Sequence, residues 1–434
     1  MSAQTKFNQS MNDLFNNQPP ITDQRVLIIG GGNVGLSFAL LLAQRGIAST
    51  LLEQTVYPTA SPDDASTRHL FDSRNIALSR RTVQIYQTMG LWQNLADHAC
   101  RIDQVSLSEQ GGFGKALLDK TAEGVESFGQ VMENAWLGKK LLQTVQAHPL
   151  ISLIDGATVT AIAQHRDSVT VTFTHNATDD AAGEQTLTAA LLVACDGQHS
   201  TARRLLEIGE TRHDYGQMAI VGVVITDQPH DHVAIERFTP HGLVAALPLP
   251  DTGAALIGAP NCRRSVVWVC PRDEAQRYLD DDAHFLATLQ HTFGAQAGTF
   301  VQAGKRGAYP LVKVLAKRQV QGRCVLMGNA AHTLHPVAGQ GFNLCMRDAD
   351  TLAQMLAQQA LRGGDLADAR VLAEYANRRH TDQKRVELFC DAVVHGFTHR
   401  NPLVKLARNI GLVAFEHVPK VKPLVATFAM GLKS

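Results

Sequence analysis

The stretch from Val26 to Glu53 constrains the fold more than any other part of the sequence. Residues 26–29 form a short apolar run that is typical of a strand buried on both faces. Residues 30–35 then satisfy Gly-x-Gly-x-x-Gly, and apolar residues recur at helical spacing until Gly46. A second apolar run ends at Glu53, about 20 residues after the glycines. We therefore predict a strand, glycine turn, helix and strand in the middle of a sheet.

Each part of this unit suits a dinucleotide. Gly30 permits a tight turn, Gly32 lets the backbone approach a pyrophosphate, and Gly35 lets the helix pack on the strand. The helix N-terminus offers free N–H groups and partial positive charge to phosphates. Glu53 can accept hydrogen bonds from a ribose diol and would repel a 2′-phosphate, which favours FAD or NAD over NADP. The alternative is a glycine-rich turn in another α/β fold.

Composition excludes several classes of protein. The chain has 434 residues, too many for one ordinary core, and its 40 basic and 40 acidic residues create no field for nucleic acid. Its seven cysteines are scattered without C-x-x-C spacing, which argues against disulfides and a metal site and favours the cytoplasm. Residues 1–22 lack the pattern of a signal peptide and are expected to be a flexible extension. The longest apolar runs are too short to span a bilayer, so we expect any contact with the inner membrane to be peripheral.

Two later stretches repeat the pattern of a buried strand followed by a turn. Residues 191–195 lead into Asp196-Gly197, where an acid at a strand end can bind a ligand or make a plain Asp-Gly turn. Residues 324–328 lead into a loop with His332, His335 and small residues, followed by a helix expected to run to about Gln359. Both histidines are acid/base candidates, and the alternative is a structural hydrogen-bonding role.

The remaining segments predict a second lobe and a helical end. Residues 218–300 mostly alternate apolar with polar residues, which predicts an antiparallel sheet that walls a substrate cavity. The C-terminal stretch gives short amphipathic pieces with basic flanks, suited to a membrane surface, a partner or a plain helical cap. The fold class is therefore α/β: a Rossmann-like FAD-binding domain, an interleaved antiparallel-sheet substrate domain and a C-terminal helical segment. The predicted boundaries are 1–22 for the extension, 23–100, 136–215 and 303–365 for the first domain, 101–135 and 216–302 for the second, and 366–434 for the end.

Taken together, the three strand-and-turn stretches resemble the flavoprotein aromatic hydroxylases of the para-hydroxybenzoate hydroxylase superfamily. Within that superfamily, four segments resemble the ubiquinone-biosynthesis branch: residues 72–79, 236–239, 305–311 and 339–344. The likeness covers nearly everything after Gln24. The motifs and the resemblance together give these cofactor-binding candidates: Gly30, Gly32, Gly35, Glu53, Arg74, Asp196, Gly197, Asn329, Pro336, Gly339, Gln340, Gly341 and Asn343. His335 is the catalytic candidate, and no metal is expected. From the residues alone, Arg74 is an ordinary surface charge.

Two positions depart from the superfamily pattern. Asn329 stands where an Asp usually bonds the ribityl chain of the flavin, and it keeps a hydrogen-bonding oxygen without the charge. The same Gly-Asn-Ala-Ala form resembles the methoxyphenol-hydroxylase branch. Asn134 stands where many members carry an Arg.

The resemblance implies a monooxygenase with bound FAD that uses NAD(P)H and O2 as co-substrates. A C4a-hydroperoxyflavin would then hydroxylate the ring of a polyprenylated methoxyphenol in ubiquinone biosynthesis. Implied partners are this phenol and the ubiquinone-biosynthesis complex. The alternatives are hydroxylation of another ring position and a non-catalytic flavin-binding subunit. A halogenase is disfavoured because the three tryptophans never form its Trp-x-Trp-x-Ile-Pro motif.

Overall fold

The computed structural model describes residues 21–57, 74–175, 183–251, 260–398, 401–417, 422, 426–427 and 430–431. A six-stranded sheet forms the core of the first lobe, in the order β18 (Val320–Gln321), β19 (Cys324–Leu326), β12 (Leu191–Ala194), β1 (Ile21–Ile29), β2 (Ile47–Leu52) and β8 (Ile151–Ile154). All neighbours are parallel except β18, which is antiparallel to β19. The predicted central position of β1 is confirmed.

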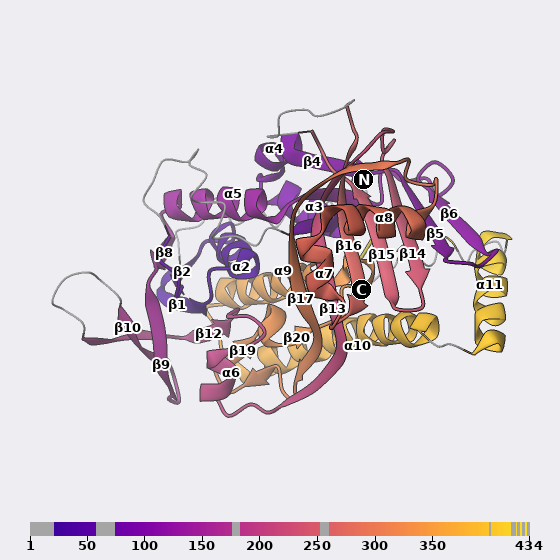
Figure 1. The fold of residues 1–434 in the computed structure, drawn as a ribbon. Coiled ribbons are helices and arrows are strands. Elements are labelled where there is room, and N and C mark those ends of the chain that lie inside the picture. The colour runs from indigo at the N-terminus through magenta and orange to yellow at the C-terminus, as the bar shows by residue number, and fades with distance from the viewer. Residues whose placement is uncertain are drawn as a thin grey trace.

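Two different layers cover this sheet (Figure 1). One face packs on helices α2 (Asn33–Ala43), α5 (Asn134–Ala147) and α9 (Gln340–Leu361). The other face packs on α6 (Thr201–Leu205) and on a small antiparallel sheet of β9 (Ala157–Gln164), β10 (Val169–His175) and β11 (Glu184–Ala189). Burial on both faces explains why the strands of the six-stranded sheet are continuous apolar runs rather than alternating ones.

The second lobe is an eight-stranded sheet in the order β20 (His332–Thr333), β17 (Phe300–Ala316), β13 (Glu210–Thr226), β16 (Arg263–Pro271), β15 (Gly242–Pro248), β14 (Val233–Thr239), β5 (Gln104–Glu109) and β6 (Lys115–Asp119). All pairs are antiparallel except β14 with β5. A third sheet joins β3 (Asn75–Ser79), β7 (Gly129–Glu133) and β4 (Ala99–Ile102), beside α3 (Arg80–Thr88) and α4 (Trp92–Leu95).

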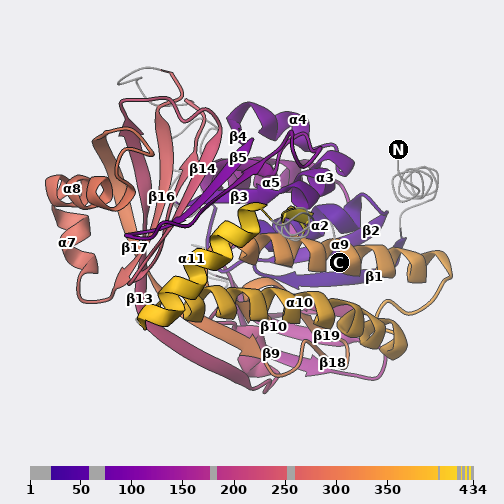
Figure 2. The same cartoon turned by 90° about the vertical axis from the view of Figure 1, so that its right-hand side faces the viewer.

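Helices α7 (Ala275–Asp280) and α8 (Asp282–Phe293) lie on the outer face of the eight-stranded sheet (Figure 2). The expectation of mainly alternating strands over 218–300 is wrong for this segment. Phe285, Leu289 and Phe293 recur every four residues and are fully buried, which is the helical pattern that the strand interpretation overlooked.

Two long helices, α10 (Ala369–Thr398) and α11 (Pro402–His417), make up most of the described C-terminal segment. No helix among the described residues is both long and apolar enough to cross a bilayer. The α/β fold class is confirmed, whereas the domain boundaries stay predictions. β1 begins at Ile21, inside the predicted extension. The sequence also predicts an exposed loop over 57–73 and a strand over 254–257, but residues 58–73 and 254–257 lie outside the described residues.

Candidate functional site

The three strand-and-turn stretches end at one edge of the six-stranded sheet. Ile29 pairs with Leu52 and with Ala194, and Ala194 pairs with Leu326, so these residues form one row across four strands. The next backbone N–H groups continue the row, because Gly30 donates to Leu52 O at 2.8 Å and Met327 donates to Ala194 O at 2.8 Å. Open α/β sheets bind ligands outside the carboxyl ends of their strands. The arrangement brings the three predicted motifs to such a position.

The glycine turn packs as tightly as its sequence predicts. Gly30 has a φ of +103°, and a side chain there would meet Cys195 C at 2.6 Å and Asp196 Cα at 2.8 Å. A side chain at Gly35 would overlap Gly30 O. Gly32, in contrast, has no atom within 4 Å of where its side chain would start, and no side chain caps the helix α2 that begins beside it. The turn is closed toward the protein and open at Gly32.

Glu53 lies beside this turn, as predicted. Its Oε2 accepts from Gly31 N at 2.5 Å, and its Oε1 accepts from Thr55 N at 2.8 Å. Tyr57 encloses the same turn by donating from its hydroxyl to Gly31 O at 2.7 Å. Burial, followed by the charges of Glu53 and Asp155, raises the pKa of Tyr57, so its hydroxyl stays a hydrogen-bond donor.

Asp196 is placed at the same edge but is already engaged with protein groups. Its Oδ1 accepts from Ser200 Oγ at 2.6 Å and its Oδ2 accepts from Ala202 N at 2.9 Å, so it fixes the start of α6. Arg203 then donates to Ala330 O at 2.7 Å, which ties this turn to the third stretch. Gly197 has a φ of +84° and open space around its missing side chain. Asp196 therefore has a structural role at the start of α6, and its direct contact with the cofactor stays a prediction.

The third stretch crosses from the parallel sheet to the eight-stranded sheet. A side chain at Gly328 would meet Val34 of α2 at 3.3 Å, and exposed Asn329 follows it directly. Residues 332–333 join the eight-stranded sheet by pairing with β17. Pro336 then precedes a short turn whose last residue, Gly339, has a φ of +59°. Buried Gln340 opens α9, where no side chain caps the first turn, and Gly341 faces open space.

Asn343 holds the start of α9 in place. Its Oδ1 accepts from Ser79 N and from Thr82 Oγ1, each at 2.8 Å, and its Nδ2 donates to Ala77 O and to Gly339 O, each at 2.8 Å. These four bonds use the whole hydrogen-bonding capacity of the amide. The side chain of Asn343 therefore positions the glycine loop rather than reaching outward.

The two candidate histidines differ sharply. His332 Nε2 lies 2.6 Å from Asp348 Oδ2, and Asp348 also accepts from Arg379 Nε of α10 at 2.5 Å. Burial alone would raise the pKa of Asp348, but Arg379 and His332 lower it to about 2. His332 thus belongs to a buried ionic network and has the structural role that was its alternative.

His335 is 4% exposed, and neither ring nitrogen has a hydrogen-bond partner among the described residues. Its nearest ring is that of Tyr215, edge-on at 5.0 Å, and the Tyr215 hydroxyl lies 3.3 Å from Asp391. Burial lowers the pKa of His335 to about 4, partly opposed by Asp391, so the imidazole is neutral at pH 7. A buried imidazole with two unused nitrogens suits contact with a ligand.

Asn134 lies beside the start of α2, and its backbone N–H donates to Arg74 O at 3.0 Å, which places Arg74 next to it. The Arg74 guanidinium lies 4.8 Å from the ring centroid of Tyr309 on β17, so two segments of the branch resemblance meet here. Asn134 Oδ1 accepts from Asn33 Nδ2 at 2.8 Å, which places this departure against the first residue of α2.

Glu236 is a further candidate for proton transfer. It lies in the segment 236–239 that resembles the ubiquinone-biosynthesis branch, but the sequence assigned it no role. Alternation along β14 places Glu236 on the same face as Ala234. The apolar cluster of Ala234 extends to Ala77, which lies beside Gly339. Glu236 is therefore on the side of β14 that faces the glycine loop. Burial raises the pKa of Glu236 to about 7, so this carboxyl can exchange a proton near neutral pH. The signal in the sequence was an acid among the apolar residues of a predicted strand.

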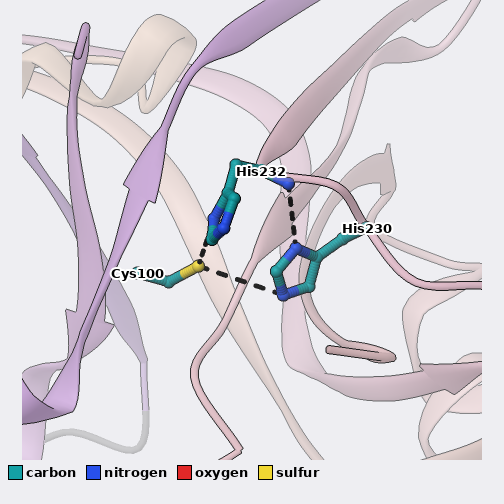
Figure 3. A group of neighbouring side chains, drawn as sticks. All are labelled: Cys100, His230 and His232. Atoms are coloured by element: carbon teal, nitrogen blue, oxygen red, sulfur yellow. Dashed lines mark hydrogen bonds between the residues drawn. The ribbon is translucent and has the colours of Figure 1, made fainter. Parts of the chain in front are cut away.

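A second cluster of chemical groups lies away from this edge, at Cys100, His230 and His232 (Figure 3). Cys100 Sγ is 3.4 Å from His232 Nδ1 and 3.9 Å from His230 Nε2. His230 Nδ1 accepts from His232 N, so a neutral ring carries its proton on Nε2, toward Leu249 O. Burial also raises the pKa of Cys100 to about 12, whereas a metal needs the thiolate. We assign no metal to the cluster. No signal in the sequence indicated this cluster, because its three members come from segments far apart in the chain.

The residues at the sheet edge fit a dinucleotide such as FAD. Two helices, α2 and α9, begin there, and no side chain in the described part of the chain caps them, so their first N–H groups and partial positive charge are available to phosphates and to a reduced flavin. Gly32 and Gly341 leave open space next to those helix starts, and Glu53 lies at the end of β2 where a ribose would bind.

Comparison with known proteins decides the family. The family described as FAD binding domain matches residues 23–389, most of the chain. This protein belongs to that family. Among the similar proteins, ubiquinone hydroxylase UbiL of Rhodospirillum rubrum is 32% identical to this chain, over 94% of this chain and 89% of its own length. The 3-demethoxyubiquinol 3-hydroxylase of Escherichia coli is 30% identical over 96% of this chain and 100% of its own.

Solved structures share the fold. The p-nitrophenol 4-monooxygenase PnpA of Pseudomonas putida superposes with a TM-score of 0.72 at 20% identity, covering 93% of this chain and 97% of its own. A variant of HpxO from Klebsiella pneumoniae, complexed with FAD, gives 0.71 at 20% identity, covering 94% and 99%. The predicted enzyme class, an FAD-dependent aromatic hydroxylase, and its bound FAD are confirmed by the family and its relatives. The individual site residues stay predictions.

Proposed function

We propose that this FAD-dependent monooxygenase hydroxylates the ring of a polyprenylated methoxyphenol in ubiquinone biosynthesis. The observation that carries the proposal is the convergence of three remote motifs at one sheet edge, in a chain whose relatives are named as ubiquinone hydroxylases. The likeness of the Lys-Arg-Gly-Ala-Tyr-Pro-Leu segment and of the Gly-Asn-Ala-Ala form to the methoxyphenol-hydroxylase branch supports the substrate class.

The protein's contribution is to hold the FAD, to orient the phenol ring against the flavin and to exclude water from the two. Bound FAD, reduced by NAD(P)H, supplies the oxygen chemistry. Gly30, Gly32 and the start of α2 would hold the pyrophosphate, and Glu53 the ribose diol. The start of α9 would place its partial positive charge at the flavin ring, and the loop through Gly339 is kept in position by Asn343.

His335 and Glu236 are the groups that would handle the phenol proton. Removing or hydrogen-bonding that proton makes the ring richer in electrons, so a positioned base contributes to the rate. We assign the hydrogen bond to the phenol to His335, because its ring nitrogens are buried and bind no other group in the described part of the chain. Glu236 is the second candidate because its raised pKa makes it a proton acceptor near pH 7.

Product analysis tests the proposal. The purified holoprotein is given NADH or NADPH and a short-chain prenyl methoxyphenol, and the hydroxylated ring is identified by mass spectrometry with 18O2. We expect one 18O atom in the product. Bound FAD with no oxygen-dependent NAD(P)H consumption and no ring oxidation would favour a non-catalytic flavin-binding subunit instead.

The position on the ring has a specific rival, because one relative is named as a 3-demethoxyubiquinol 3-hydroxylase. Metabolite profiling of cells that lack this protein separates the two. Accumulation of the polyprenyl methoxyphenol supports the proposed step, and accumulation of a later precursor assigns the protein to that other position. Membership of a biosynthetic complex stays a prediction.

A further inference from the structure

Helix α11 turns a large apolar face toward solvent, in addition to the apolar Leu412 and Phe415 that pack on the protein. Its exposed large side chains are Leu403 (74%), Leu406 (48%), Ile410 (54%) and Val413 (38%). Ala407, Gly411 and Ala414 are exposed between them, and these positions recur at intervals of three and four on one face. Among the described residues of α11, that exposed face contains no Asp, Glu, Lys or Arg.

Arg408, Asn409 and Glu416 of α11 face inward and bind the protein. Asn409, 2% exposed, donates to Glu109 Oε2 at 2.6 Å and accepts from Gly114 N at 2.8 Å. Arg408 donates to Glu109 Oε1 at 2.5 Å, and Glu416 accepts from Leu117 N at 2.8 Å. One of these bonds uses the Leu117 N–H of β6, the edge strand of the eight-stranded sheet, and another uses the Gly114 N–H just before that strand. The helix is therefore fixed in orientation, and its apolar face is directed outward.

The position of α11 suits contact with a flat surface. It lies at the far edge of the molecule from the parallel sheet and beside β6 (Figure 1). β6 itself exposes Leu117, and the turn before it exposes Phe113. With 16 residues, α11 is about 24 Å long, so its outward side is an extended apolar strip.

The charge of this part of the chain indicates the kind of surface. Residues 392–434 contain six lysines and arginines but one acid, Glu416, although the whole chain has no net charge. An apolar face in a part of the sequence with excess basic residues matches the interface of a bilayer with anionic lipids. A water-soluble protein partner would explain the apolar strip but gives no reason for the basic excess.

We propose that α11 lies in the interface of an anionic lipid bilayer, with Leu403, Leu406, Ile410 and Val413 inserted among the headgroups. The proposal follows from α11 itself and does not depend on which phenol is hydroxylated. If the proposed function is correct, it also gives the surface from which a polyprenylated substrate would enter.

Vesicle flotation tests this inference with the full-length holoprotein. The vesicles contain phosphatidylcholine alone or phosphatidylcholine with phosphatidylglycerol. The double variant Leu406→Asp, Ile410→Asp changes exposed side chains, so the fold should persist, and its FAD absorbance is the check. Val301→Asp is the matched control, since Val301 is 52% exposed on β17.

We expect the wild type and the control to float with anionic vesicles, less with neutral ones and less at high salt. The double variant should lose about tenfold or more of this binding. A wild type that floats with neither vesicle, or a double variant that floats like the wild type, would overturn the proposal. A dimer that the double variant converts to a monomer, without vesicle binding, would assign the strip to a second copy of this chain.

A labelled protein gives a second readout that needs no enzyme activity. All seven native cysteines are buried, so Ile410→Cys can be labelled selectively with a polarity-sensitive dye. A blue shift on adding anionic vesicles supports insertion of α11. An unchanged spectrum in vesicles that bind the protein would mean that another surface makes the contact.

Discussion

The two main sheets serve the site in different ways. The six-stranded parallel sheet offers mainly backbone at its edge: glycines, helix starts and a row of strand ends. The eight-stranded sheet and the loop that joins it offer side chains instead, above all half-buried Glu236 and buried His335. This protein therefore binds the cofactor and handles protons with different parts of its structure. Cofactor binding depends on the shape of the backbone, and proton transfer depends on how burial shifts the pKa of side chains.

The sharpest way to break this comparison is Gly32→Glu. The substitution places a carboxylate where the backbone is open and where a pyrophosphate would bind, so we expect FAD affinity to fall about 1000-fold or more. Retained yellow colour after gel filtration is the measurement. Gly183→Glu is the control, because Gly183 is exposed and also has nothing within 4 Å. A yellow Gly32→Glu protein would mean that the cofactor lies elsewhere.

Asp348→Asn tests whether the network behind the loop is structural. It removes a fully buried charge that binds both His332 and Arg379, and we expect a loss of about 3 kcal/mol in the free energy of unfolding. Urea denaturation measures it. Glu374→Gln, which breaks an exposed pair with Arg378, should cost less than about 0.5 kcal/mol. Equal effects of the two variants would contradict the structural role of the network.

His335→Asn and Glu236→Gln compare the two proton-handling candidates. For the residue that handles the phenol proton, we expect kcat to fall about 100-fold with FAD content unchanged. The pH profile identifies it, since loss of Glu236 should remove an ionisation near pH 7 from kcat/KM. Two variants with normal kcat and an unchanged profile would remove both residues from the mechanism.

The smallest effect concerns stability against pH. Burial lowers the pKa of His230 and His335 to about 4, below the value of about 6.5 in an unfolded chain. The unfolded state therefore binds more protons, and stability is lost as pH falls from about 6.5 to about 4. Glu236, with its pKa raised to about 7, acts in the opposite sense and offsets part of this loss.

Urea midpoints between pH 7 and 4.5 measure this balance. In Glu236→Gln the offset is gone, so the loss of stability on acidification should be steeper than in the wild type. An identical pH dependence of the two proteins would contradict the raised pKa of Glu236.

Features of the fold that depend on neighbouring residues could be predicted well from the sequence. The glycine turn was predictable because Gly30 and Gly35 lie where any side chain would meet backbone atoms. The functions of Asp196 and His332 were left open because their partners, Ser200 and Asp348, become visible only in the fold. The helices α7 and α8 were missed because the strands around them dominated the pattern.

By itself, the sequence determined the strand, glycine turn and helix from Val26 to Glu53, the repeated strand ends at Asp196 and Gly328, and the dinucleotide chemistry that follows. These features depend on steric limits and spacing within short segments. Only the tertiary structure decided that His332 binds Asp348 while His335 has no partner among the described residues, that the pKa of Glu236 is raised to about 7, and that the apolar face of α11 is directed outward. Burial and hydrogen-bond partners set those properties, and they come from segments far apart in the chain.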